Sequence, residues 1–240
     1  MNSLEIMKQY LLPLLGALPT TLYLLFTSVL IALVLGFLLT WAKIGKIRIL
    51  QGIANLFISF MRGTPMMIQV LLTFILVPII AFQNGVDTSK WDPINYAIVA
   101  FGLNEAAFFA EIFRSAYLSL DYGQIEAAES LGMSRMQVFR RVILPQGAAA
   151  ALPNTTNMTL ELMKNTSIAM VIGVYDIMGK AVQLGKNNYG VGQEELYFEV
   201  AVVFWVLGLI IQAISNNASD RLNKGNASYR RKRIFSQKNC

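Results

Sequence analysis

Glu161 and Lys164 are charged side chains inside an apolar run that extends from about residue 153 to 175. They are three residues apart, so on a helix they share one face with Asn157. A charge at the centre of a membrane helix costs at least about 2.5–3.5 kcal/mol, so each needs a partner or a wet cavity. The two side chains form either an internal ion pair or a site for a zwitterion, with the carboxylate facing an amino group and the ammonium facing a carboxylate.

Asn104 and Glu105 lie near the middle of another apolar run and are candidates to line a polar cavity in the membrane. Nearer the end of that run, Glu111 and Arg114 are three residues apart. This spacing predicts a structural ion pair between them.

The segment Arg62-Gly63-Thr64-Pro65 interrupts a third apolar run. Pro65 has no N–H and therefore frees a carbonyl, which Thr64 or a ligand could engage. Transporters often place ligand sites where a membrane helix is discontinuous, so Thr64 is a candidate for the substrate pathway and Arg62 for a gate or a carboxylate contact. A simple helix kink is the alternative.

The residue inventory argues against enzymatic chemistry. The chain has no histidine, and its single cysteine is Cys240, so no internal disulfide or thiolate metal cluster can form. The carboxylates show no metal-ligand spacing, and the nucleotide-binding pattern G-x-x-x-x-G-K-[ST] is absent. We predict a chain that is not an enzyme and binds no metal or cofactor, with any ATP hydrolysed by a separate polypeptide.

The elements that position these residues are predicted to be membrane helices. The chain is 55% hydrophobic and 14% charged, with a mean hydropathy of +0.51, whereas a soluble domain carries about 25% charged residues. A span needs about 20 apolar residues, and we expect five, at about 20–42, 53–82, 94–118, 153–175 and 196–218. The expected fold class is an all-α integral membrane protein with one transmembrane domain at 20–220.

The N-terminal residues 1–19 are predicted to form an amphipathic segment in the membrane interface, with Leu4, Met7, Leu11 and Leu14 on its apolar side. The following charge-free run is much longer than the core of a signal peptide, about 7–15 residues. No small-residue cleavage site follows this run, so we expect the first span to stay in the membrane.

Lysine and arginine residues fall mostly on one side of the predicted spans. Fourteen of them follow the first, third and fifth spans, whereas the other side has four, Lys8, Lys90, Lys180 and Lys186. The positive-inside rule therefore places the N-terminus outside, the C-terminus in the cytoplasm and the loops at 83–93 and 176–195 outside. The net charge of +6 thus indicates membrane orientation rather than nucleic-acid binding, and the tail 221–240 is expected beside anionic lipid headgroups.

The segment 121–146 is charged and has apolar residues at roughly helical spacing. Gly132 predicts the end of one helix, and Ser134 the capped start of another. Two short helices parallel to the membrane are therefore expected on the cytoplasmic side. Pro145 is expected to force an extended backbone at Leu144, before the fourth span.

This segment, "EAAESLGMSRMQVFRRVILP", resembles the permease signature of ABC importers. That signature reads Glu-Ala-Ala, three residues, Gly, nine residues and Ile-x-Leu-Pro, and the one departure here is Val142. The stretches "RGTPMMIQ" (62–69), "LMKNTSIAMVI" (162–172) and "FFAEIFRSAYLSLDYGQIEAAESLG" (108–132) are similar to those of the polar amino-acid uptake permeases of type I importers. The resemblance covers roughly residues 15–220.

The resemblance implies a multi-pass subunit of the bacterial cytoplasmic membrane. Its expected partners are a second permease subunit, a cytoplasmic ATPase dimer that uses ATP and Mg²⁺, and an extracytoplasmic binding protein. The substrate would be a polar amino acid, with cystine slightly favoured over glutamine, glutamate and arginine; whether the permease pair is a homodimer or a heterodimer stays open. The residues implied in ATPase coupling are Glu126, Ala127, Ala128, Gly132, Leu144 and Pro145.

A secondary transporter or channel is the alternative from another class. It would need ion sites of its own, and it gives no reason for the charged segment 121–146. The polar residues expected in the substrate pathway are Asn157, Glu161, Lys164, Asn104, Glu105, Arg62 and Thr64.

Overall fold

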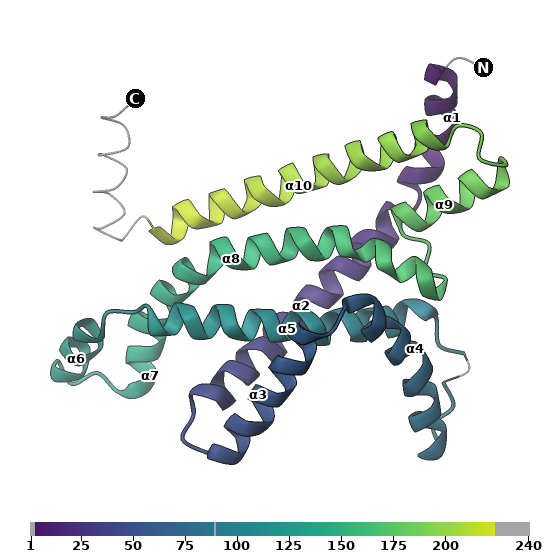
Figure 1. Ribbon diagram of the computed structural model, residues 1–240. Helices are drawn as coiled ribbons and strands as arrows, with labels where there is room; N and C mark the ends of the chain where they lie inside the picture. The colour runs from purple at the N-terminus through teal and green to yellow at the C-terminus, as the bar shows by residue number, and fades with distance from the viewer. Residues whose placement is uncertain (1–2, 89, 224–240) are drawn as a thin grey trace, which may run out of the picture. The chain divides into compact units, whose positions relative to one another are not determined.

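A computed structural model describes residues 3–88 and 90–223, and the side chains of residues 9–88 and 90–222. All regular elements in these residues are helices, which confirms the predicted fold class (Figure 1). In chain order they are α1 (Ser3–Leu15), α2 (Leu18–Ile44), α3 (Arg48–Gly63), α4 (Met66–Gln83), α5 (Pro93–Leu118), α6 (Tyr122–Ser130), α7 (Arg135–Val138), the π-helical η1 (Phe139–Ile143), α8 (Leu144–Asn165), the 3₁₀-helical η2 (Thr166–Ile172), α9 (Ile177–Asn187) and α10 (Gln193–Asn223).

Within the described part of the chain, four segments are long and apolar enough to cross a membrane: Gln9–Ile44, Met66–Gln83, Pro93–Leu118 and Gln193–Leu222. A fifth is obtained when the pair Arg135–Ile172 and Ile177–Asn187, bent by 47°, is counted as one span. The prediction of about five spans agrees with this count. The predicted orientation of the termini stays a prediction.

The predicted span 53–82 is two helices rather than one. α3 ends at Gly63, and α4 begins at Met66 and alone has the length and hydropathy of a span. Thr64 between them is extended, with φ −116° and ψ 145°, because the ring of Pro65 disfavours a helical conformation in the residue before it. α3 instead packs back against α2.

The predicted boundaries near residues 153–195 also change. α8 begins at Leu144, nine residues before the expected start of the fourth span, and the expected outer loop 176–195 contains α9. Asp176, which is buried, makes this helix begin: its carboxylate accepts bonds from the Gly179 N–H (2.8 Å) and the Thr166 hydroxyl (3.1 Å). The Thr21 hydroxyl accepts a bond from the next N–H, that of Ile177, at 3.1 Å.

The chain divides into two compact units. The first comprises the residues up to Glu111 and Met158–Gly208, and the second comprises Ile112–Asn157 and the chain from Leu209 on. In the first unit, α1 contributes to an apolar core instead of lying separately at its edge. This core contains Tyr10, Leu14, Ala17, Ile177, Ala181, Leu196 and Val200.

The expected amphipathic stripe of α1 is partly visible. Leu14 is buried and Leu11 is exposed, whereas the side chains of Leu4 and Met7 lie outside the described residues.

In the second unit, a hydroxyl–hydroxyl bond of 2.5 Å joins Thr156 of α8 to Ser215 of α10. The basic tail predicted at 221–240 lies outside the described residues from 224 on, and so does Cys240.

The first unit also contains a close crossing of α2 and α5, which we call the seam. It is formed by Ile31, Gly36 and Thr40 against Gly102, Ala106 and Ala110. Glycine, alanine and threonine allow two membrane helices to approach this closely. A Cβ atom on Gly36 would lie 2.8 Å from Cβ of Phe109, so no side chain fits there.

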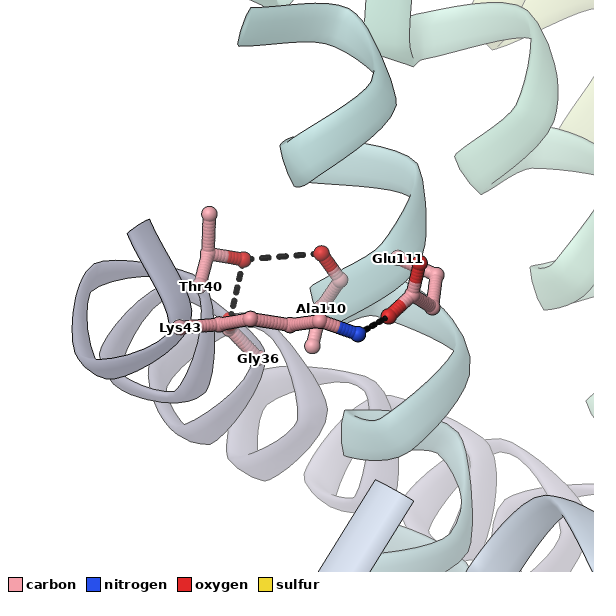
Figure 2. A network of polar contacts seen from close by, with 5 residues as sticks. All are labelled: Gly36, Thr40, Lys43, Ala110 and Glu111. Carbon is pink, nitrogen blue, oxygen red and sulfur yellow. Dashed lines mark hydrogen bonds and ion pairs between the residues drawn. The ribbon is translucent and has the colours of Figure 1, made fainter. Parts of the chain in front are cut away.

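Polar contacts fasten one end of the seam (Figure 2). The Thr40 hydroxyl lies 2.8 Å from the Gly36 carbonyl and 2.9 Å from the Ala110 carbonyl across the crossing. One turn further along, Lys43 forms an ion pair with Glu111. Local spacing cannot reveal this partner on another helix, and the ion pair expected between Glu111 and Arg114 stays a prediction.

Candidate coupling and transport sites

The charged segment 121–146, called the elbow below, folds into two short helices. α6 begins after Asp121, whose carboxylate accepts a 2.9 Å bond from the Gly123 N–H. α6 ends at Ser130, and the turn that follows contains Gly132. The φ of Gly132 is +79°, a left-handed conformation that glycine adopts without steric cost. Ser134 and Gln137 form a capping box at the start of α7, with reciprocal bonds of 3.4 and 2.8 Å. The predicted helix end near Gly132 and the predicted start of a second helix capped by Ser134 are confirmed.

The Glu-Ala-Ala triplet of the elbow points in two directions. Glu126 and Ala127 are exposed, whereas Ala128 is buried, as is Val138. α6 packs against α7 and η1, so Ala128 belongs to the inside of this small hairpin. The side chains that a partner can reach are therefore those of Glu126 and Ala127.

Two large apolar side chains add to the outer surface of the elbow. Leu131 is 80% exposed and Met136 is 63% exposed. They lie on either side of the Gly132 turn, where exposed apolar side chains are typical of a docking surface. The elbow thus presents an acidic and an apolar group together.

Leu144 is helical, with φ −62° and ψ −47°, so the extended backbone predicted before Pro145 is wrong. The π-helical turn η1 precedes it, and the Leu144 N–H bonds to the carbonyl of Phe139, five residues back. A π turn is wider than an α turn, which gives the Pro145 ring room beside the carbonyls of the preceding turn. The chain therefore passes from the elbow into α8 without leaving a helical conformation.

The amide side chains of Gln69 and Asn104 bond to the backbone at the helix break before Pro65. Pro65 cannot donate to the Met61 carbonyl four residues back, and this carbonyl instead accepts bonds from Gln69 Nε2 (2.9 Å) and Asn104 Nδ2 (3.1 Å). Asn104 Nδ2 also donates to Gln69 Oε1 at 2.9 Å. Gln69 and Asn104 are both buried, so this network joins α3, α4 and α5 in an apolar interior.

Thr64 and Arg62 flank this network. The Thr64 hydroxyl donates to the Phe60 carbonyl (2.9 Å) and accepts from Gln69 Nε2 (2.6 Å). Arg62 is exposed, and its guanidinium carbon lies 5.3 Å from the centre of the Phe108 ring, within the range of a cation–π contact. The structure thus joins Thr64 to the network through Gln69 and places Arg62 against Phe108 of α5, and the roles of both residues in substrate passage stay predictions.

Glu105 is 1% exposed, and its Oε2 atom has no hydrogen-bond partner among the described residues. Glu161, Lys164 and Asn157 are exposed. Among the described residues, Glu161 and Lys164 form no ion pair with each other, so both charged groups are available to other partners.

Residues 28–224 match the family of binding-protein-dependent transport system inner membrane components. This match covers most of the chain. The chain belongs to this family.

Several relatives in this family are described as amino-acid permeases. The L-cystine transport system permease protein TcyL of Bacillus subtilis is 39% identical over 86% of each chain. The probable amino-acid ABC transporter permease protein PatM of Vibrio harveyi is 34% identical over 89% of this chain and 94% of its own. The L-cystine permease protein TcyB of Bacillus subtilis is 30% identical over 92% and 91%.

Solved structures show the same fold. A crystal structure of an amino acid ABC transporter with histidines is 28% identical, with a TM-score of 0.78, covering 92% of this chain and 99% of that one. The MetNI methionine ABC transporter in an inward-facing conformation shares the fold, with a TM-score of 0.69 at 20% identity and coverage of 89% and 98%. The resemblance predicted from the sequence is confirmed, and the chain is a multi-pass inner-membrane permease.

Gln69 is a central residue of this permease that the sequence analysis missed. A signal was present, because Gln69 is a polar residue in the first turn of an apolar helix, four residues after Pro65. A proline that leaves a carbonyl free inside a membrane calls for a nearby donor, and an amide can supply one. Asn104 was expected to line a cavity, but both hydrogens of its amide nitrogen have partners in the network.

Proposed function

We propose that this chain is the transmembrane permease subunit of an ATP-driven importer that takes up a polar amino acid. The observation that carries the proposal is the elbow, a hairpin of short helices with Glu126, Ala127, Leu131 and Met136 on its outside. A cytoplasmic ATPase with a groove for this hairpin could move it when ATP closes the ATPase dimer. The permease itself hydrolyses nothing, and ATP and Mg²⁺ belong to that partner.

The assembly includes three further kinds of subunit. A second permease, of the same or a related sequence, pairs with this one, and two ATPase subunits dock on the two elbows. An extracytoplasmic binding protein delivers the amino acid. This arrangement places the N-terminus outside and the elbow and C-terminus in the cytoplasm, as the distribution of lysine and arginine supports.

The substrate is a polar amino acid, and L-cystine is the first to test. Two relatives, at 39% and 30% identity, are L-cystine permeases. The polar groups that support a zwitterionic substrate are Glu105, Glu161 and Lys164, with Asn157, Asn104, Arg62 and Thr64 as further candidates along the pathway.

ATP-driven uptake by the reconstituted complex tests the proposal. The permease is assembled with its ATPase and binding protein in proteoliposomes, and accumulation of radiolabelled amino acids is measured with and without ATP. Ala127→Asp, which adds a charge to the exposed side of the triplet, is expected to reduce uptake at least about tenfold and to weaken retention of the ATPase. Glu194→Ala changes an exposed glutamate in the first turn of α10 and should leave both unchanged.

Two results would contradict the proposal. One is uptake by the permease alone in an ion gradient without ATP, which would identify a secondary transporter. The other is labelling of an elbow cysteine, Met136→Cys in a Cys240→Ser background, by an impermeant maleimide added outside intact cells. Tyr189→Cys in the same background lies in the connection between α9 and α10 and is expected to be labelled from outside.

A further inference from the structure

The seven-residue segment η2 is the starting point of a further inference. It directly follows α8 and is wound as a 3₁₀ helix, a conformation in which runs longer than three or four residues are uncommon. The hydrogen-bond geometry of a 3₁₀ helix is also poorer than that of an α-helix. A 3₁₀ helix of this length therefore requires support from outside its own backbone.

One support is the burial pattern of η2. Thr166, Ala169 and Ile172 are buried, whereas Met170 and Val171 are exposed. Residues three apart lie above one another on a 3₁₀ helix, so the three buried side chains share one face, and η2 packs against α4, α9 and α2. On an α-helix the same three side chains would spread over about 120°, so packing favours the 3₁₀ form.

A second support is a hydrogen bond that ties the two ends of η2 together. The hydroxyl of Thr166, its first residue, donates to a carboxylate oxygen of Asp176 at 3.1 Å. Asp176 lies four residues past the end of η2, beyond Gly173, whose φ is +88°. The other carboxylate oxygen accepts the Gly179 N–H at 2.8 Å, at the start of α9. Thr166 and Asp176 are both 0% exposed, so water does not compete for these bonds.

We propose that the bond between Thr166 and Asp176 is a latch, which holds η2 in its 3₁₀ form and is released when ATP binds to the partner ATPase. After release, η2 continues α8 as an α-helix. Each residue rises 2.0 Å along a 3₁₀ helix and 1.5 Å along an α-helix, so the segment shortens by about 3.5 Å. Release by ATP rests on the proposed function, whereas the latch itself does not.

Both forms of η2 are permitted in an apolar interior. A 3₁₀ helix and an α-helix each bond their backbone groups within the segment, so neither form leaves these groups unsatisfied. The two forms differ in length and in which side chains share a face, and no form between them keeps either set of bonds. A segment with two discrete arrangements can respond to a movement elsewhere in the protein as a switch.

Thr21 of α2 provides a matched control for the latch. It is also 0% exposed, and its hydroxyl accepts the Ile177 N–H at 3.1 Å. This bond joins the start of α9 to α2 but does not join the ends of η2. Thr166→Val and Thr21→Val therefore remove the same hydroxyl at equal burial, and only the first breaks the latch.

Asp176→Asn separates the latch from the charge of the carboxylate. The amide oxygen of this variant can still accept the Gly179 N–H, and the amide nitrogen can donate to the Thr166 hydroxyl. That hydroxyl also lies 2.9 Å from the Met163 carbonyl, to which it can then donate. Asp176→Asn should keep the latch, whereas Asp176→Ala loses both bonds of the carboxylate.

The length of η2 is measured as the distance between two spin labels by pulsed electron paramagnetic resonance. The labels are attached to Glu161→Cys before η2 and Tyr175→Cys after it, both exposed positions, in a Cys240→Ser background. The sample is the complex of permease and ATPase, without nucleotide and with ATP bound to a hydrolysis-deficient ATPase. Uptake and ATP hydrolysis are measured on the latch variants without the label cysteines and with an active ATPase.

We expect the label distance in the wild-type complex to become about 3.5 Å shorter when ATP is bound. Thr166→Val and Asp176→Ala should show the shorter distance already without ATP, and Thr21→Val and Asp176→Asn should behave as wild type. Thr166→Val should also lose ATP-driven uptake while it keeps ATP hydrolysis, because a latch that is already released cannot respond to the ATPase.

The inference is overturned if Thr166→Val keeps the wild-type distance without ATP or if Thr21→Val shortens it equally. It is also overturned if ATP leaves the wild-type distance unchanged in a complex that accumulates the amino acid. Failure of the proposed function gives a different result, namely a wild-type complex that accumulates no amino acid with ATP. The comparison of Thr166→Val with Thr21→Val needs no ATP and tests the latch in that case too.

Discussion

Gly36 in the seam and Gly132 in the elbow are both positions that favour glycine, and the causes differ. A Cβ on Gly36 would lie 2.8 Å from Cβ of Phe109 and 3.2 Å from backbone atoms of Ala106 and Ala110, at an ordinary helical conformation. A Cβ on Gly132 would meet nothing within 4 Å, but φ there is +79°. At Gly36 there is no room for a side chain, whereas at Gly132 the backbone conformation disfavours residues other than glycine.

This difference matches what the two regions do. The seam holds two membrane helices together through small side chains and short polar contacts, so its energy comes from close packing. The elbow keeps its shape through local hydrogen bonds and leaves its apolar and acidic groups exposed. A tightly packed helix crossing and an exposed turn thus use glycine in two ways.

The largest effect is expected from Gly36→Leu. The added side chain has no room against Phe109 and the α5 backbone, so the two helices must separate and the seam is lost. We expect a loss of at least about 3 kcal/mol, seen as failure to purify a monodisperse protein or as a large drop in its detergent melting temperature. Gly52→Leu is the matched control, because that helical glycine has nothing within 4 Å; equal loss in both variants would contradict the packing argument.

A smaller effect is expected from Gly132→Val. A β-branched residue at a left-handed conformation is strained, so the turn between α6 and α7 should rearrange and ATP-driven uptake should fall by about tenfold. Gly132→Asn should retain most uptake, since asparagine tolerates this conformation. Melting temperatures of both variants should stay near wild type. Equal uptake by the valine and asparagine variants would contradict the conformational explanation.

The ion pair between Lys43 and Glu111 lies at the end of the seam. Lys43→Met leaves Glu111, which is partly buried, without this partner and is expected to cost about 1–2 kcal/mol. The double variant Lys43→Met, Glu111→Met should be less destabilised than the sum of the two single variants. A double-mutant cycle on unfolding free energies measures this coupling, and strict additivity would mean that the pair adds nothing to the seam.

The smallest effect is expected from Ser134→Ala in the elbow. It removes the hydroxyl that accepts the Gln137 N–H and should cost about 1 kcal/mol locally. Faster amide hydrogen exchange at residues 135–138, with an unchanged melting temperature, is the expected observation. Thr40→Ala removes a hydroxyl from the seam and should instead lower the melting temperature. The reverse pattern would contradict the view that the elbow is stabilised locally.

The sequence predicted best where a signal is local and repeated. The spans at α5 and α10 follow from the length of their apolar runs, and the turn at Gly132 and Ser134 follows from the preferences of two residues. The family signature correctly identified the class of protein. These features depend on residues close together in the sequence and not on contacts with other helices.

Contacts between distant residues could not be predicted in the same way. Small residues such as Gly36 and Gly102 give no hydropathy contrast, so the seam has no periodic signature. The Lys43–Glu111 pair joins residues 68 positions apart, and the Gln69–Asn104 bond joins residues 35 positions apart. Leu144 was wrongly expected to be extended because the usual effect of proline was applied without the π turn before it.

That π turn also determines the angular relation between the elbow and the start of α8. Removing one residue from η1 would leave a continuous α-helix, but it would rotate the start of α8 by about 100° relative to α6 and α7. The face of α8 that carries Thr156 would then turn away from the side it now occupies. The additional residue in η1 therefore sets the rotational position of the start of α8, and its loss would separate Thr156 from Ser215 without changing either side chain.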